Sequence, residues 1–134
     1  MEGQSEYMIR GDELFFFNKK TAALPLYKAF ARRLLAEIDN VTIKVQKTQI
    51  SFSNRRNFAF VSFLPVRRAR ERPETWITVT FGLSYKKESP RIDVASEPYP
   101  NRWTHHMLIS SVDDIDDELM EWIKEAAVFS AGKR

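Results

Sequence analysis

Apolar residues recur every three or four positions in two stretches of the chain, the spacing that places side chains on one face of an α-helix. The first stretch covers about residues 22–38 and the second about residues 114–130. Ser111 or Asp113 is the expected N-terminal cap of the second helix. The pattern therefore predicts two amphipathic helices, one in each half of the chain, with a short helical turn at about residues 11–14.

Between these helices apolar residues alternate with polar ones, which is the period of a half-buried β-strand. Strands are predicted at about residues 41–45, 50–52, 58–64, 76–83, 92–95 and 103–110. The apolar positions change from odd to even numbers between residues 46 and 49, so a turn or bulge is expected there. Residues 58–64 are apolar on both faces, which favours a central strand, and Phe52, Phe58 and Phe60 are expected to face the core.

Short connections between successive strands favour antiparallel pairing, because parallel crossovers need a dozen or more residues. The sequence therefore predicts an α+β domain, with a single antiparallel sheet of about five to six strands and two main helices packed on one face. Residues 1–134 are expected to form a single domain, with residues 1–10 flexible and residues 131–134 a frayed end. In a simple meander, the turn at 53–57 and the loop at 85–91 would share one end of the sheet.

The net charge of +3 conceals an uneven distribution. Residues 1–91 carry 17 Lys and Arg against nine Asp and Glu, whereas residues 92–134 carry four against nine. Many of the acidic residues fall at 113–118, at the start of the second predicted helix, where the helix dipole favours negative charge. The basic part of the chain favours a polyanion partner, above all nucleic acid; the alternative is an acidic protein surface, including that of a second copy in a homodimer.

Two groups of basic residues are candidates for binding a polyanion. They are Arg55, Arg56, Arg67, Arg68, Arg70, Arg72, Lys86 and Lys87. Arginine offers a planar fork of donors that matches phosphate oxygens. On a meander these residues divide between the two ends of the sheet, so an extended polyanion passing Lys44 and Lys47 is favoured over a compact anion site. Solubility is the competing explanation for the same charges.

A small-molecule site or enzyme pocket between the sheet and the helices is the third alternative. The candidate ligand-binding residues are Lys47, Thr48, Arg56, Trp103, His105 and His106. Because adjacent strand residues point to opposite faces, the two histidines are not expected to chelate one metal ion. No catalytic residue, metal ligand or cofactor is predicted, and a non-catalytic binding or accessory role is favoured over an enzyme.

The chain contains no cysteine, which excludes disulfides and thiolate metal sites and fits a reducing compartment. The apolar run at residues 14–17 is too short for a signal peptide or a membrane span. A cytoplasmic location without a membrane partner is therefore expected.

Several segments carry a resemblance to a known family. They are VQKTQISF at 45–52, RNFAF at 56–60, NRWTHH at 101–106 and DIDDEL at 114–119. These segments resemble DUF5655, a family of small bacterial domains of unknown function, and the resemblance covers most of the chain from about residue 23 onward. It implies a compact domain that stands alone or accompanies other uncharacterised or nuclease-like modules. The family supplies no established catalytic residues.

Overall fold

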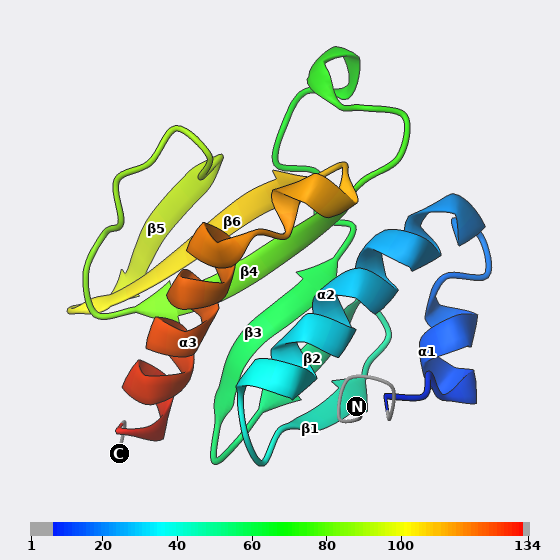
Figure 1. The fold of residues 1–134 in the computed structure, drawn as a ribbon. Helices are drawn as coiled ribbons and strands as arrows, with labels where there is room; N and C mark the ends of the chain where they lie inside the picture. Colours follow the sequence, from blue (N-terminus) through cyan, green and yellow to red (C-terminus); the bar gives the residue numbers. More distant parts are fainter. Residues whose placement is uncertain (1–6, 133–134) are drawn as a thin grey trace.

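The computed structural model describes residues 7–132, which form an α+β fold around one six-stranded antiparallel sheet (Figure 1). The strands are β1 (Thr42–Val45), β2 (Gln49–Ser53), β3 (Asn57–Ser62), β4 (Ile77–Leu83), β5 (Val94–Tyr99) and β6 (Arg102–Ile109). The helices are α1 (Gly11–Phe16), α2 (Leu24–Glu37) and α3 (Asp117–Ala131), with 3-10 turns η2 (Thr21–Ala23), η3 (Ala69–Glu71) and η4 (Val112–Asp114). The predicted fold class is confirmed. The behaviour expected of residues 1–6 and 133–134 lies outside the described residues.

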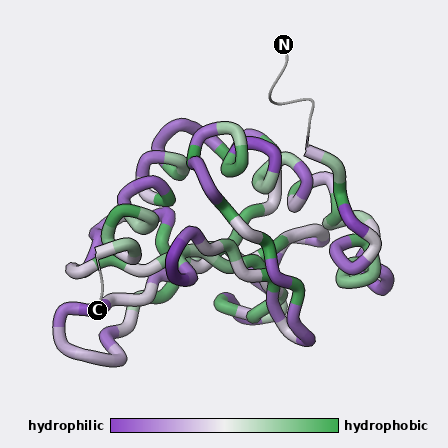
Figure 2. Tube along the Cα trace, turned by 90° about the horizontal axis from the view of Figure 1, so that it is seen from below, coloured by the Kyte–Doolittle hydropathy of each residue, from purple (hydrophilic) through white to green (hydrophobic). Residues whose placement is uncertain are grey.

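The two long helices, α2 and α3, lie on the same face of the sheet, as predicted (Figure 1, Figure 2). The core fills the space between them and the strands, and its aromatic rings pack in pairs. Phe30 of α2 meets Phe52 of β2 edge-on, with ring centroids 5.7 Å apart. Phe81 of β4 lies 6.0 Å from the ring of Trp122 of α3. Much of the aromatic content of the chain therefore stabilises the helix-covered face.

A 3-10 turn precedes each long helix, so both begin later than their periodicity predicts. Ser111 caps η4, because its hydroxyl accepts a hydrogen bond from the backbone N–H of Asp113 at 3.1 Å. Asp116 caps α3 instead, accepting from the backbone N–H of Leu119 at 3.0 Å. The prediction that Ser111 or Asp113 caps this helix is wrong, since the intervening turn moves the helix start to Asp116.

The strand order is β1-β2-β3-β4-β6-β5, so β6 lies between β4 and β5 and the sheet is not a simple meander. Both β4 and β5 pair antiparallel with β6, and they therefore run in the same direction. The segment at 84–93 consequently crosses from one end of the sheet to the other (Figure 1). This corrects the expected grouping of basic residues: Lys86 lies near Trp103, while Arg91 lines a hollow together with Arg67.

The short helix α1 is held by a buried carboxylate, that of Glu13. The hydroxyls of Tyr7 and Tyr27 both donate to Glu13 Oε2, and the backbone N–H of Arg10 donates to Oε1 at 2.8 Å. Burial beside this carboxylate raises the pKa of both tyrosines well above its usual range. Residues 7 and 10, at the end of the segment expected to be flexible, are thus hydrogen-bonded to the fold.

Candidate functional site

Within residues 7–132 no helix covers the face of the sheet opposite α2 and α3 (Figure 1), and the strand register defines which side chains this face presents. Thr80 of β4 lies opposite Phe60 of β3 on one side and His106 of β6 on the other. Phe60 in turn lies opposite Ser51 of β2. Since side chains alternate between the two faces of a sheet, these four form a row across the middle of the open face.

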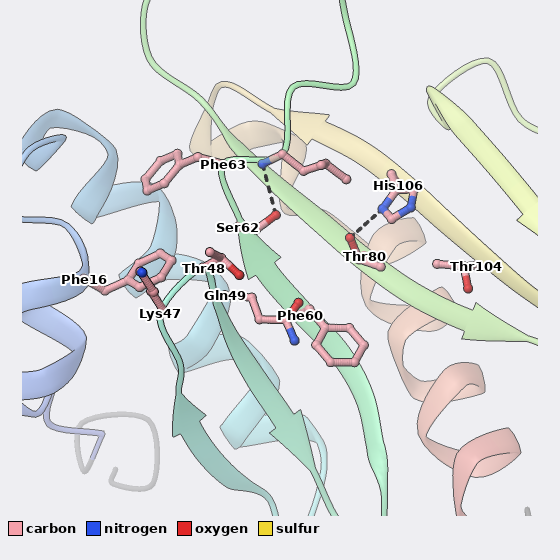
Figure 3. A pocket seen from close by; sticks show the side chains of 11 residues that line it. Phe16, Lys47, Thr48, Gln49, Phe60, Ser62, Phe63, Thr80, Thr104 and His106 are labelled. Atoms are coloured by element: carbon pink, nitrogen blue, oxygen red, sulfur yellow. Dashed lines mark hydrogen bonds between the residues drawn. The ribbon is translucent and has the colours of Figure 1, made fainter.

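A hollow of about 630 Å³ lies over this row (Figure 3). It is lined by Phe16, Lys47, Thr48, Gln49, Phe60, Ser62, Phe63, Leu64, Thr80, Thr104 and His106. Figure 3 shows Phe16 and Lys47 at one end of the hollow and Thr80 and His106 toward the other. The rings of Phe16 and Phe63 stack with centroids 5.8 Å apart and an angle of 13° between their planes. The hollow therefore combines aromatic rings, hydroxyl groups and one lysine.

A second hollow, of about 310 Å³, adjoins the first and shares Phe60, Thr80 and Thr104 with it. Arg56 and Arg102 belong to its lining, as does Gly82, which has no side chain to fill the space. We call the two hollows together the sheet groove. The β3 residues along it span 57–62, and a strand rises about 3.3 Å per residue, so the groove is on the order of 20 Å long.

The sheet groove is cationic, and the described residues that line it include no Asp or Glu. Strands β1, β2, β3, β4 and β6 include no Asp or Glu at all, and among the described residues only Glu97, in β5, brings a carboxylate into the sheet. Lys47, Arg56 and Arg102 line the groove, and none of the three forms an ion pair within residues 7–132. Their charge is therefore available to a ligand.

Two basic residues on the helix-covered side, Lys87 and Arg91, are by contrast paired with acidic residues in α3 and at its N-terminal cap. Arg91 Nη1 lies 2.9 Å from the carboxylate of Asp116, and Lys87 Nζ lies 3.1 Å from that of Glu125. Burial alone would raise the pKa of Asp116, but the hydrogen bond from Leu119 and the guanidinium of Arg91 lower it overall. The acidic residues in α3 and at its cap thus neutralise cations of their own chain.

The adjacent histidines lie on opposite faces of β6, as the alternation predicts. His106 lines the sheet groove with its Nδ1 2.8 Å from Thr80 Oγ1, and burial lowers its pKa. His105 is buried in the core, where its Nε2 accepts from the backbone N–H of Lys87 at 2.9 Å and its ring stacks on Phe81. Burial lowers the pKa of His105 as well. His106 therefore offers the groove a neutral imidazole beside a hydroxyl.

The structure brings together four of the six predicted ligand-binding residues. Those lining the groove are Lys47, Thr48, Arg56 and His106. Trp103 and His105 face the other side of the sheet, where Lys86 Nζ lies 6.0 Å from the Trp103 ring. The groove is on the open face, and the expected site between sheet and helices is occupied by core side chains.

The arginines of the loop at 65–73 do not form one cluster. Arg67 forms an ion pair with Asp93 at 2.8 Å, and Arg72 packs over an aromatic ring. Arg68 and Arg70 are exposed. The other predicted basic residues are spread out: Arg55 is exposed in the turn before β3, Arg56 lines the groove, Lys86 lies near Trp103 and Lys87 pairs with Glu125.

Phe60 is the main residue that sequence reasoning misplaced. Phe52 and Phe58 are buried as expected, with 0% and 2% of their surfaces exposed, but Phe60 lies on the open face and lines both hollows. A signal for the open face exists in β4, where Thr78, Thr80 and Gly82 alternate with apolar residues. Phe60 itself is found only once its register opposite Thr80 is known. Thr104 and Arg102 were missed for the same reason.

The described part of the chain contains neither a cluster of metal-binding side chains nor a helix suited to crossing a membrane. Residues 7–132 include no group of three or more His, Asp or Glu side chains placed to hold a metal ion. No helix among them has the length and apolar composition needed to cross a membrane.

These features define a small α+β domain with one helix-covered sheet face and one open, cationic, grooved face. A family model described as "Domain of unknown function (DUF5655)" matches residues 14–130, and the chain belongs to this family. The resemblance of its motifs is thereby confirmed. No curated protein and no solved structure matches the chain.

Proposed function

We propose that the protein is a non-catalytic binding module that takes an anionic ligand in the sheet groove. The observation that carries the proposal is the arrangement of Lys47, Arg56 and Arg102 along one groove without an acidic residue or an ion-pair partner among the described residues. A groove lined by charge of one sign concentrates ligands of the opposite sign. The paired cations of the helix-covered side have no comparable effect.

The other side chains that line the groove support binding of a ligand rather than catalysis. Gln49, Thr80 and Thr104 offer hydrogen bonds, and Phe60 offers an apolar surface beside them. Acid–base catalysis needs a positioned proton donor and acceptor. Among the described lining residues His106 is the one histidine, burial lowers its pKa, and Thr80 already contacts its Nδ1. The groove therefore fits a ligand with an anionic part and an apolar or aromatic part.

Three charge-matched double variants test this proposal. Lys47→Gln/Arg56→Gln removes two cations from the groove, Arg68→Gln/Arg70→Gln removes two from the loop at 65–73, and Lys28→Gln/Arg32→Gln removes two from α2. Binding of a fluorescein-labelled oligonucleotide is measured by anisotropy as salt is raised. Each phosphate contact to a single strand contributes about −0.7 to the slope of log K against log salt.

The groove variant is expected to bind at least about tenfold more weakly at low salt, with a slope shallower by about 1.4. The other two variants are expected to retain the slope of the unchanged protein. Equal losses in all three would show that the net charge attracts the ligand diffusely, and would refute the groove as the site.

A further inference from the structure

We infer that the anionic ligand is unpaired nucleic acid, with one base stacked on the ring of Phe60. This inference rests on the anion site proposed above and adds the chemical class of the ligand. Its starting point is the environment of Phe60, which differs from that of the other strand phenylalanines.

Phe60 lies near the middle of the open face, with hydroxyl side chains opposite it on both neighbouring strands and Gln49 beside it in the first hollow (Figure 3). Its cross-strand neighbours are Ser51 and Thr80, and Ser62 follows it on the same face of β3. Phe52, Phe58 and Phe81 are buried, with 0%, 2% and 0% of their surfaces exposed, whereas Phe60 is partly exposed. Phe60 has no ring partner among the described residues and lines both hollows, so its ring is accessible to a flat ligand.

A protein that stacks a base on an accessible aromatic ring, as proposed for Phe60, is expected to bind unpaired nucleic acid more tightly than paired nucleic acid. Within a duplex each base is stacked on both sides by its neighbours, so its face cannot reach a side chain. In a single strand the bases separate and stack on aromatic side chains, with cations following the phosphates. The sheet groove has both elements, since cations lie toward both ends and the ring of Phe60 lies between them.

The dimensions and polar groups of the groove agree with this ligand. A length on the order of 20 Å accommodates a short run of about three to five nucleotides, near the lower end of single-strand site sizes. Lys47 at one end and Arg56 and Arg102 at the other are placed to meet phosphates on either side of the stacked base. Thr80, Thr104 and His106 line the same hollow as Phe60 and offer hydrogen-bonding groups for the edge of that base.

An acidic polypeptide would pair with the same cations, but it has no flat bases to stack on the ring of Phe60. Its carboxylates lie on flexible side chains, and it presents no regular series of flat apolar surfaces. The position of Phe60 therefore favours nucleic acid over an acidic protein surface, and the two ligands are separated by removing the bases while keeping the phosphates.

The experiment compares four labelled probes of equal length: an oligothymidylate, an abasic deoxyribose-phosphate oligomer, a DNA duplex and poly-glutamate. Affinities are measured by anisotropy at low salt for the unchanged protein, Phe60→Ala and Phe60→Trp. Stacking of one base is worth about a 5- to 100-fold change in affinity. Phe60→Ala is expected to weaken oligothymidylate binding by that factor and leave abasic-oligomer binding within about twofold. Phe60→Trp is expected to retain tight binding, because its ring is larger.

Three outcomes would overturn the inference: equal affinity for the oligothymidylate and the abasic oligomer, a preference for duplex or poly-glutamate, or no effect of Phe60→Ala. In each case anion binding that still depends on Lys47 and Arg56 leaves the proposed function standing. Loss of that dependence removes the proposed function itself. Thermal unfolding of Phe60→Trp, together with its retained binding of the abasic oligomer, verifies that the groove is intact.

Discussion

The two faces of the sheet are built by the same alternation of residues and differ in what covers them. On the helix-covered side β4 contributes Ile77, Val79 and Phe81, each with 0% of its surface exposed. On the open side the same strand contributes Thr80 and Gly82, which line the sheet groove. Charges differ as well, since Lys87 and Arg91 on the first side are paired with acids of α3 and its cap, whereas the groove cations Lys47, Arg56 and Arg102 have no ion-pair partner within residues 7–132. Stability is therefore expected to depend on one face and ligand binding on the other.

Truncating a phenylalanine on each face gives the largest expected difference. Phe52→Ala removes a fully buried ring that packs against Phe30 and Tyr27, and a change of this kind costs about 3–5 kcal/mol of unfolding free energy. Phe60→Ala removes a partly exposed ring from the open face and is expected to cost about 1 kcal/mol or less. Urea denaturation of both variants measures the two values.

Equal destabilisation by the two substitutions would show that Phe60 is part of the core, and the division between the faces would fail. Phe52→Leu serves as the control, because it keeps the site apolar and is expected to cost less than Phe52→Ala.

Removing a charge on the helix-covered side has the next largest expected effect. Asp116→Ala deletes the cap of α3 and one of the two carboxylate partners of Arg91, and loss of a cap costs about 1 kcal/mol, with a range of about 0.5–2. Asp117, the next residue, has a side chain that is 95% exposed. Asp117→Ala is the matched control and is expected to change stability by about 0.5 kcal/mol or less. Thermal unfolding at one salt concentration compares the two.

Removing cations from the sheet groove is expected to leave stability nearly unchanged, unlike removing the carboxylate of Asp116. Lys47→Gln/Arg56→Gln breaks no ion pair within the described residues and is expected to leave unfolding free energy within about 0.5 kcal/mol. A loss as large as that of Asp116→Ala would mean that these cations are structural, which would contradict their assignment to a ligand.

A fall in pH is expected to lower the free energy of unfolding, because His105 is buried as a neutral ring in the folded protein. Burial lowers the pKa of His105 in the folded protein, so the unfolded chain takes up the proton first as the pH falls. Stability from the neutral ring is fully present above the unfolded pKa of about 6.5 and is lost as the pH falls below that value. Unfolding measured at neutral and mildly acidic pH should show this loss in the unchanged protein.

His105→Phe is expected to reduce the acid-induced loss, at a cost of about 1 kcal/mol at neutral pH for the hydrogen bond from Lys87. His106 also has a lowered pKa, so His106→Gln measures its share. An undiminished acid effect in His105→Phe would assign the pH dependence to other groups.

Filling the floor of the groove is expected to change stability slightly and in the stabilising direction. A Cβ at Gly82 would meet only the carbonyl oxygen of Trp103, at the ordinary distance of 3.7 Å. Gly82→Val is therefore expected to stabilise the strand by about 0.5–1 kcal/mol. Its side chain would occupy the second hollow, so anion binding is expected to weaken while the melting temperature rises. Stabilisation with unchanged binding would place the ligand elsewhere.

The helices and most strands are predictable because their periodicities are unambiguous. The alternation in β4 and the three-to-four-residue spacing in α2 and α3 place the core residues without further information. The insertion of β6 between β4 and β5 is not predictable in this way, since a meander satisfies the same alternation. The arrangement depends on long-range contacts, such as those of Lys87 and Arg91 with α3.

The groove residues are predictable only in part. The sequence shows which residue types could bind a ligand, but the strand register decides which face of the sheet each residue occupies. Lys47, Arg56 and His106 are recognisable as ligand-binding residue types, and the structure places all three in the groove. His105 has the same chemistry but faces the core. Phe60 is as apolar as a core residue and lies in a strand that is apolar on both faces. Only its pairing opposite Thr80 assigns it to the open side.

The assignment of ligand binding to the open face is tested most directly by mapping amide chemical shifts while an oligothymidylate is added to isotope-labelled protein. The largest shifts are expected along the sheet groove, at Lys47, Phe60, Thr80, Thr104 and His106, whereas amides on the solvent side of α2 and α3 are expected to stay unchanged. Shifts concentrated at Arg68 and Arg70, or along α3, would contradict the assignment.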